Sequence, residues 1–352
     1  MSGSLKLVAH FGEGDRVEGR SASDALMDLV AASGVAGAVL LRGVEGFGLS
    51  SRLRTDRLLS LSDDLPLVAV AVGAAGPVAA LARRAAALLP GLVTLERVAV
   101  PDLGGERDSP AALGGRHAKV SLLCGRGEPA ARGAVAAMRG AGLSGALALV
   151  GVDGTMRGER RRARVLARNE GVPCLVQGYG PAERVPDLLP RLRALAGRHV
   201  IVVERVHVVR RDGAAVGDLP AVPSEDPGGM GLWQRVSVAC GEDARWEGRP
   251  LYERLIRRLR EEGAAGATAL RGGWGYTGDG RGHGDHLLSL RRRAPVIVSI
   301  IDRPEAIRRL WPVVAAATAA TGLVTCETVP AAQARAPGGS SSGGLGLSRP
   351  PA

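Results

Sequence analysis

The chain has 352 residues, of which 45% are hydrophobic and 3% aromatic, and its formal net charge is +11. This length and apolar content exclude a wholly disordered chain and predict two or three domains with cores of Val, Leu, Ala and Ile. The four cysteines lie far apart in the sequence and form no CxxC pair, so a disulfide scaffold and a structural zinc site are excluded. Reduced thiols and a cytoplasmic location are expected.

The positive charge comes almost entirely from arginine, because Lys6 and Lys119 are the only lysines. The arginines are scattered and few aromatic residues accompany them, so no nucleic-acid partner is expected. The N-terminal segment MSGSLKLVAHFGEGD lacks the features of a signal peptide. The uncharged stretch 65–82 is interrupted by two glycines and a proline, which favours a strand, a turn and a helix over a membrane span.

One segment recurs three times, as GVAGAVLLRGVEGFG at 34–48, GLSGALALVGVDGTM at 142–156 and GAAGATALRGGWGYT at 263–277. The second and third copies follow the first at offsets of 108 and 229 residues, and the similarity extends well beyond the segment. Such periodicity indicates tandem copies of one structural unit. We therefore expect three repeats, at residues 5–100, 117–209 and 233–330.

Each repeat shows the same order of apolar periodicities, with a proline opening its third strand. A glycine is expected to end the first helix of each repeat, at Gly34, Gly142 and Gly263. The helices are expected near residues 22–33, 77–89, 129–140, 181–196, 250–262 and 304–319. The order βαββαβ predicts an α+β fold of three tandem ferredoxin-like plaits.

Segments rich in Gly, Pro and charge separate the repeats, at 101–116 and 210–232, and are predicted to be linkers. Residues 331–352, which end in APGGSSSGGLGLSRPPA, are predicted to form a disordered tail. The second repeat departs most from the others, because Val150 stands where they have arginine and its first loop is shorter. We interpret it as degenerate; the alternative is a new anion site in its arginine-rich loop.

The third repeat contains GRPLYERLIRRLREEGAAGATALRGGWGYTG followed by HLLSL, and the first contains RGVEGFGLSSRLRTDRLLSLSDDLP. These motifs closely resemble the PII-like proteins of the domain-of-unknown-function group 190, over nearly all of repeats one and three and more weakly over repeat two. PII-type proteins are trimers of ferredoxin-like plaits that bind small anions such as adenine nucleotides between subunits. The resemblance implies an intramolecular PII-like pseudo-trimer that is self-contained and monomeric.

The resemblance also implies a regulatory protein rather than an enzyme. Its ligand would be an adenine nucleotide or another small anion, and it would act on a membrane transporter or another regulated protein. No cofactor is implied. The alternative is a ligand-free structural adaptor that docks a transporter or another partner directly.

The loop after the second strand of each repeat is the candidate ligand site. The ligand is expected between repeats one and three or at a cleft that the glycine loops border. Closely spaced glycines let backbone N–H groups approach an anion, and arginine offers a planar fork for phosphate or carboxylate. The alternative is a flexible loop with solvated charges. The candidate ligand-binding residues are Gly43, Glu45, Gly46, Gly48, Arg52, Arg54, Arg160, Arg271, Gly272, Trp274, Gly275, Arg281 and His283.

No catalytic or metal-binding residue is assigned. No Ser, His and Asp combination recurs, and the glycine-rich run from His283 to His286 does not fix the geometry that a metal site needs. Glu96, Glu204 and Glu327 do recur near the end of the last strand. We interpret them as structural partners of an arginine or a loop N–H, with a functional role as the alternative.

Overall fold

The computed structural model describes residues 3–49, 51–55, 64–103, 115–125, 129–163, 171–195, 197–277, 283–284, 294–336 and 338–347. The fold is α+β, with antiparallel strands that carry helices on one side. Three units of similar topology follow one another along the chain.

The first unit contains four main strands and two helices. Its strands are hydrogen-bonded in the antiparallel order β4–β7–β1–β8. The elements are β1 (Ser4–Gly12), α1 (Ala22–Ala31), β4 (Gly37–Arg42), β7 (Pro66–Ala74), α2 (Ala75–Leu88) and β8 (Gly91–Val98). A short hairpin of β2 (Arg16–Val17) and β3 (Arg20–Ser21) precedes α1.

The second unit has the antiparallel order β10–β12–β9–β13. Its elements are β9 (His117–Gly125), α3 (Pro129–Gly140), β10 (Gly145–Met156), β11 (Glu159–Arg162), β12 (Pro173–Pro181), the 3-10 turn η3 (Ala182–Arg184), α4 (Val185–Arg193) and β13 (His199–Arg211). In the third unit, with the order β18–β21–β15–β22, the elements are β15 (Trp233–Gly241), β16 (Arg245–Trp246), β17 (Arg249–Pro250), α5 (Leu251–Glu261), β18 (Ala267–Arg271), β21 (Pro295–Asp302), α6 (Pro304–Ala317) and β22 (Leu323–Val329).

The predicted helices are confirmed to within a few residues, and so are the glycines that end three of them. Gly34, Gly142 and Gly263 have φ values of +71°, +77° and +73°. Glycine adopts this left-handed conformation at little cost, so it can reverse the chain directly after a helix. The amphipathic pattern is also met: α5 buries residues that share one helical face, such as Leu251, Leu255 and Leu259.

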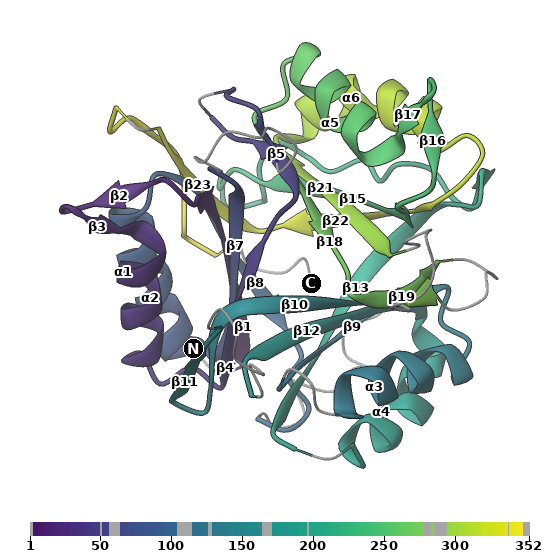
Figure 1. The fold of residues 1–352 in the computed structure, drawn as a ribbon. Helices are drawn as coiled ribbons and strands as arrows, with labels where there is room; N and C mark the ends of the chain where they lie inside the picture. The colour runs from purple at the N-terminus through teal and green to yellow at the C-terminus, as the bar shows by residue number, and fades with distance from the viewer. Residues whose placement is uncertain are drawn as a thin grey trace.

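The three sheets surround a common centre, and the helix pairs α1–α2, α3–α4 and α5–α6 lie on the outside (Figure 1). The inward faces of the sheets share one apolar core, to which every unit contributes: Val39 and Val70 from the first, Leu123 and Leu175 from the second, Ile297 from the third. Each unit also has a separate core between its sheet and its helices. Burial of two sheet faces therefore ties the three units into one body.

Neighbouring units exchange strand pairs at three places, which we call seams. At seam 1/3, β5 (Glu45–Phe47) of the first unit pairs with β18. At seam 3/2, β19 (Trp274–Thr277) of the third unit pairs with β10. At seam 2/1, the second half of β10 pairs with β4. The segment after the second strand of each unit thus extends the sheet of the next unit, and the three exchanges close a circle.

The last strands extend the units in the same manner. Residue Ala99 bridges to Val203, and the end of β13 pairs with β22. Residues of the segment that was predicted to be a disordered tail form β23 (Ala331–Arg335), which pairs with β8, and β24 (Ser341–Gly344), which pairs with β23. The structure therefore differs from the expectation here, because three small alanines of β23 are buried while its backbone covers the edge of β8.

The two predicted linkers differ in how much of them the structure describes. Residues 104–114 of the first lie outside the described residues. In the second, Arg210 and Arg211 end β13 and β14 (Ala214–Ala215) turns back on it, whereas the rest runs irregularly over the surface.

Candidate functional site

Six buried charged side chains form a closed ring where the three inward sheet faces meet; we call it the charge ring. Each unit supplies one basic residue from its first strand and one glutamate from its last strand. The two lie directly opposite each other in the sheet, as Lys6 with Glu96, Lys119 with Glu204, and Arg235 with Glu327. All six residues are at most 6% exposed.

Each basic side chain also binds the glutamate of another unit. Lys6 contacts Glu204 of the second unit. The Nζ of Lys119 lies 2.5 Å from Oε2 of Glu327 in the third unit. Arg235 returns to the first unit, with 2.6 Å between its Nη2 and Oε1 of Glu96. These contacts run from unit to unit around the whole circle, so each charge has two partners of opposite sign.

Burial by itself would raise the pKa of Glu96, but Arg235 and Lys6 hold that pKa well below its usual value. Burial likewise opposes the charge on Lys119, whereas Glu204 and Glu327 raise its pKa above the usual value. Glu96 and Lys119 therefore stay ionised at neutral pH despite their desolvation. With three positive and three negative members, the ring is neutral.

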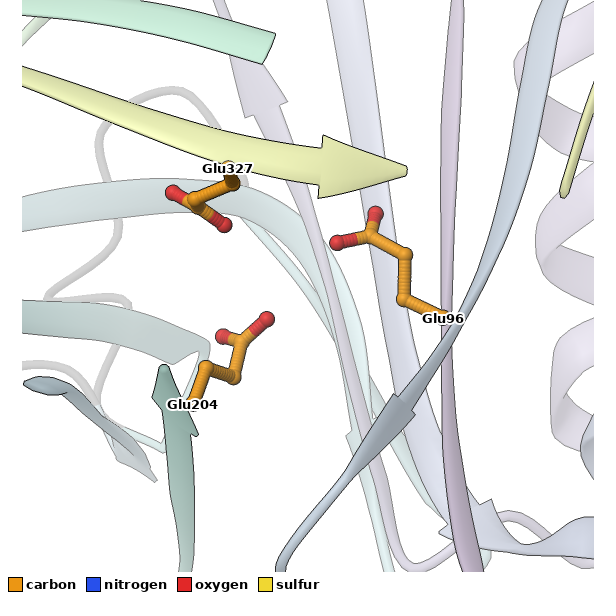
Figure 2. Close-up of side chains that lie close together, drawn as sticks. All are labelled: Glu96, Glu204 and Glu327. Atoms are coloured by element: carbon orange, nitrogen blue, oxygen red, sulfur yellow. The ribbon is translucent and has the colours of Figure 1, made fainter. Parts of the chain in front are cut away.

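The three glutamates point toward one another (Figure 2), and their nearest oxygens lie within 4.8 Å of one another. Among the described residues they are the cluster best placed to hold a metal ion. Their charge, however, is already balanced by the three basic residues, so a cation would have to displace these partners. Glu96 and Glu327 bind Arg235, as the interpretation of them as arginine partners expected, whereas Glu204 binds the two lysines.

Lys6 and Lys119 were not predicted to pair with these glutamates. The sequence did contain a sign of this pairing. Only two of the 46 basic residues are lysines, and both occur at equivalent positions of two repeats. Both lie on the first strand, where an alternating pattern puts them on the inward face.

The glycines of the candidate loops lie at the seams, where two backbones approach closely. A Cβ on Gly46 would lie 2.6 Å from the carbonyl oxygen of Ala267, and one on Gly154 would lie 2.5 Å from that of Ala38. A Cβ on Gly275 would lie 2.3 Å from the carbonyl oxygen of Ala146. The recurring glycine is therefore required by strand pairing between units.

Gly43 and Gly272 also lie where two units approach closely, so a side chain at either position would crowd its neighbours. Their N–H groups donate to Pro66 and Pro295 of their own units, and the next residue in each case donates to the neighbouring unit. A ligand-binding role for the seam glycines stays a prediction, because their conformation already has a structural cause.

One side chain at each seam faces the first helix of the neighbouring unit. Glu45 is buried, with its Oε1 3.8 Å from Nε of Arg257 on α5. At seam 3/2, the guanidinium of Arg132 on α3 lies 5.4 Å from the ring centroid of Trp274. These contacts differ chemically between the seams and favour one cyclic order of the units.

Seam 2/1 uses an arginine that the sequence proposed as a ligand residue. Nη2 of Arg160 lies 2.6 Å from Oδ2 of Asp153, and its Nη1 lies 2.6 Å from Oδ1 of Asp28 on α1. The hydrogen bond to Asp153 and then that to Asp28 help to raise the pKa of Arg160. An anion at this position would have to compete with two carboxylates.

Of the remaining candidate residues, two are arginines that lie near a carboxylate, and two others are not described or only in their backbone. Arg271 binds Glu242, with 3.0 Å between Nη2 and Oε1, whereas the exposed Arg52 lies 3.9 Å from Asp64. Arg281 lies outside the described residues, and of His283 only the backbone is described, in β20 (His283–Gly284), which pairs with β19.

A cavity of about 90 Å³ lies between the first and third units. Its walls include Gly48 and Arg54 from the candidate loop of the first repeat. Its apolar lining includes Phe11, Phe47, Leu49, Trp233 and Ile301, and its polar lining includes His10, Asp15, Thr268, Ser299 and Arg335. We call this cavity the 1/3 cleft. Trp233 and Arg335, which lies in the segment predicted to be a tail, line the cleft without having been predicted to do so.

Charges at the 1/3 cleft are mostly paired. Nε of Arg54 donates to Oδ2 of Asp64 at 2.9 Å, and its Nη2 lies 3.5 Å from Asp15. Burial raises the pKa of Asp15, although the N–H of Gly12 and the charge of Arg54 oppose the shift. The inner wall carries His10, whose pKa burial and the charge of Arg235 lower to about 3. A neutral imidazole therefore faces the cleft at physiological pH.

No helix in the described part of the chain combines the length and the apolar character that crossing a membrane requires.

Two solved structures that resemble parts of this chain do so only weakly. An anthrone oxidase-like protein is 14% identical with a TM-score of 0.16, covering 58% of this chain and 92% of its own. Chlorite dismutase from Candidatus Nitrospira defluvii is 11% identical with a TM-score of 0.17, over 58% of this chain and 92% of its own. Scores this low carry no argument about fold or activity.

Sequence relatives are closer and are about one repeat long. A UPF0166 protein of Aquifex aeolicus (strain VF5) is 40% identical over 94 residues, which is 26% of this chain but 86% of that protein. A UPF0166 protein of Methanocaldococcus jannaschii is 31% identical over 77 residues, or 22% of this chain and 70% of that protein.

A family model described as "Uncharacterized ACR", DUF190, matches residues 4–100, 124–208 and 233–331. These segments coincide with the three repeats expected from the sequence. The chain belongs to the DUF190 family and carries its domain three times.

Proposed function

We propose that this protein is a one-chain, PII-like pseudo-trimer of ferredoxin-like plaits that senses a small ligand in the 1/3 cleft. The strand order of each unit, the circular exchange at the seams and the charge ring support the pseudo-trimer. Covalent linkage keeps the three units at high effective concentration and lets their clefts diverge. It acts in the cytoplasm as a monomer, without catalysing a reaction; the four unbridged cysteines are in keeping with that location.

The observation that carries the sensing role is the 1/3 cleft itself, because two units contribute its walls. Phe47 and Leu49 come from the first unit, whereas Ala267 and Ile301 come from the third. A ligand there contacts both units at once, so its binding energy depends on how they are placed relative to each other. A change at seam 1/3 is then passed to a partner, such as a membrane transporter or another regulated protein.

Adenine nucleotides and other small anions are the first ligands to test. The apolar walls suit a flat base, and Arg54 and Arg335 stand at the cleft for an anionic group. Such a group must compete with Asp64 and Asp15 for Arg54.

The test is a thermal-shift panel with ATP, ADP, AMP, cyclic nucleotides, bicarbonate and fluoride, followed by calorimetry. A ligand at 100 times its dissociation constant stabilises the fold by about 2.7 kcal/mol. Leu49→Arg obstructs the mouth of the cleft and should remove the shift, because Leu49 is 41% exposed and lines it. Leu103→Arg, at a side chain 48% exposed that is not among the lining residues, is the matched control.

A shift that survives Leu49→Arg would place the ligand elsewhere. A flat panel with a folded, monomeric chain would favour the adaptor, which binds its partner without a small ligand.

A further inference from the structure

Two cysteines of the second unit face each other across neighbouring strands. Cys124, on β9, and Cys174, on β12, are direct partners in the antiparallel register. Their Sγ atoms lie 3.3 Å apart, and neither side chain is exposed. Directly opposed residues have Cβ atoms about 4.5–5.5 Å apart, whereas a disulfide needs about 3.5–4.5 Å, so the two strands must approach slightly for the bond to form.

This pair is particular to the second unit. The equivalent partners are Phe11 with Leu67 in the first unit, and Cys240 with Val296 in the third. The other two cysteines, Cys240 and Cys326, therefore have no thiol opposite them in the sheet.

We propose that Cys124 and Cys174 are an oxidation site that forms a reversible disulfide with a peroxide as oxidant. The sulfur atoms need to approach by about 1.2 Å to reach a bond of about 2.05 Å, through side-chain rotation together with a small approach of the two strands. One thiolate attacks a peroxide oxygen to give a sulfenic acid and one water. The second thiol displaces the hydroxyl as a second water. Two thiols and one hydrogen peroxide thus give one disulfide and two waters, and a dithiol reverses the step.

Access to the buried pair is set by its place in the sheet. Cys124 is the penultimate residue of β9 and Cys174 is the second residue of β12, so only the pair of Gly125 with Pro173 lies beyond them. Strand ends open locally at low cost, whereas the middle of a sheet does not. Burial raises the pKa of Cys240 and that of Cys326 to about 12. Cys124 and Cys174 are no more exposed than these two, so the reaction of the pair depends on local opening of the strand ends.

The crosslink would reach seam 2/1. Residue Pro173, next to Cys174, has its carbonyl oxygen 2.1 Å from where a Cβ of Gly151 would lie. Gly151 is the residue at which β10 leaves its own sheet to pair with β4 of the first unit. Oxidation would therefore fix the first and third strands of the second unit directly beside the place where that unit joins the first.

The test uses the full native chain, reduced, treated with hydrogen peroxide, blocked with an alkylating reagent and digested with trypsin. Cleavage at Lys119, Arg126, Arg168 and Arg184 places the two cysteines in peptides 120–126 and 169–184. We expect these peptides linked, lighter than their sum by two hydrogen atoms, and free thiols in denaturant falling from the four of the reduced chain to half that number. Dithiothreitol should restore all of them.

Cys326→Ala is the matched control, because Cys326 is 1% exposed and has no opposed thiol, and it should keep the linked peptide. Cys174→Ala should lose it. Four free thiols remaining in the peroxide-treated native chain would overturn the proposal. So would recovery of Cys124 and Cys174 only as sulfinic or sulfonic acids, or in links between two chains. The peptide map of the wild-type chain decides the matter even if a variant fails to fold.

Discussion

The guanidinium of Arg235, in the third unit, donates two hydrogen bonds to the carboxylate of Glu96, in the first, at 2.6 and 2.9 Å. The two residues are 139 positions apart in the sequence. Both are buried, and their pairing closes the charge ring. A buried pair of this kind adds little over an apolar substitute, but losing one member leaves an uncompensated charge in the core.

Arg235→Met should therefore lower the free energy of unfolding by about 3–5 kcal/mol, measured by urea denaturation. The double variant Arg235→Met with Glu96→Met removes one charge of each sign and should lose less than the single variant. Arg308→Met, which removes an exposed pair with Glu305, should change stability by about 1 kcal/mol or less. If the double variant loses as much as the sum of its single changes, pairing is not what stabilises the ring.

The seam glycines give a second prediction. Gly154→Ala places a methyl group against the carbonyl oxygen of Ala38 in the first unit and should destabilise the fold by about 1–3 kcal/mol. Gly76→Ala, on α2, meets no atom within 4 Å and should be neutral or add up to about 1 kcal/mol. Thermal or urea unfolding measures both. Equal effects at the two positions would mean that close approach at the seam is unimportant.

Because the pKa of His10 is lowered, the stability of the fold should fall with acidification already above the pH range in which carboxylates titrate. Its pKa is about 3 in the folded protein against an ordinary value of 6.5, so between these values the unfolded chain binds a proton more readily. Stability is therefore lost as pH falls from 6.5, by about 2 kcal/mol at pH 5 from this residue. Between pH 7 and pH 5 the free energy of unfolding, from denaturation curves, should fall by about 2 kcal/mol more in the wild type than in His10→Gln. If the stability of the wild type and that of His10→Gln changed equally between pH 7 and pH 5, the pKa of His10 would not be lowered in the folded protein.

The C-terminal strand gives a fourth prediction. Deleting 331–352 removes β23, whose five residues pair with β8, and should cost about 2 kcal/mol or more. It also bares the edge of β8, so self-association should rise in size-exclusion chromatography. Deleting only 348–352 is the control and should change neither stability nor size. A 331–352 deletion as stable as the full chain would mean that β23 contributes nothing.

Local chemistry explains what could be predicted about the fold. Three repeats, the order of their elements and the helix ends at Gly34, Gly142 and Gly263 follow from periodicity and from the conformations open to glycine. Family membership follows from motifs within single repeats. For the candidate site, the sequence left two positions open, one between the first and third repeats and one at a cleft bordered by the glycine loops. Of the candidate residues, Gly48 and Arg54 line the 1/3 cleft, and ligand binding there stays a prediction.

The sequence by itself determined the three units, because each unit's pattern lies within about 100 neighbouring residues. Only the tertiary structure decided what joins them. Lys6 and Glu204 are 198 residues apart in the sequence, so no local pattern connects them. The composition of residues 331–352 predicts a disordered tail, because it does not reveal that β23 pairs with β8. Closely spaced glycines are typical both of an anion-binding loop and of strands whose backbones approach closely. Which of the two roles the seam glycines have depends on the backbone of another unit, and the sequence does not show where that backbone lies. The role of a charged residue or a glycine can be assigned only when its neighbours in space are known. The reason is that the interaction energy depends on distance in space and not on separation in the sequence.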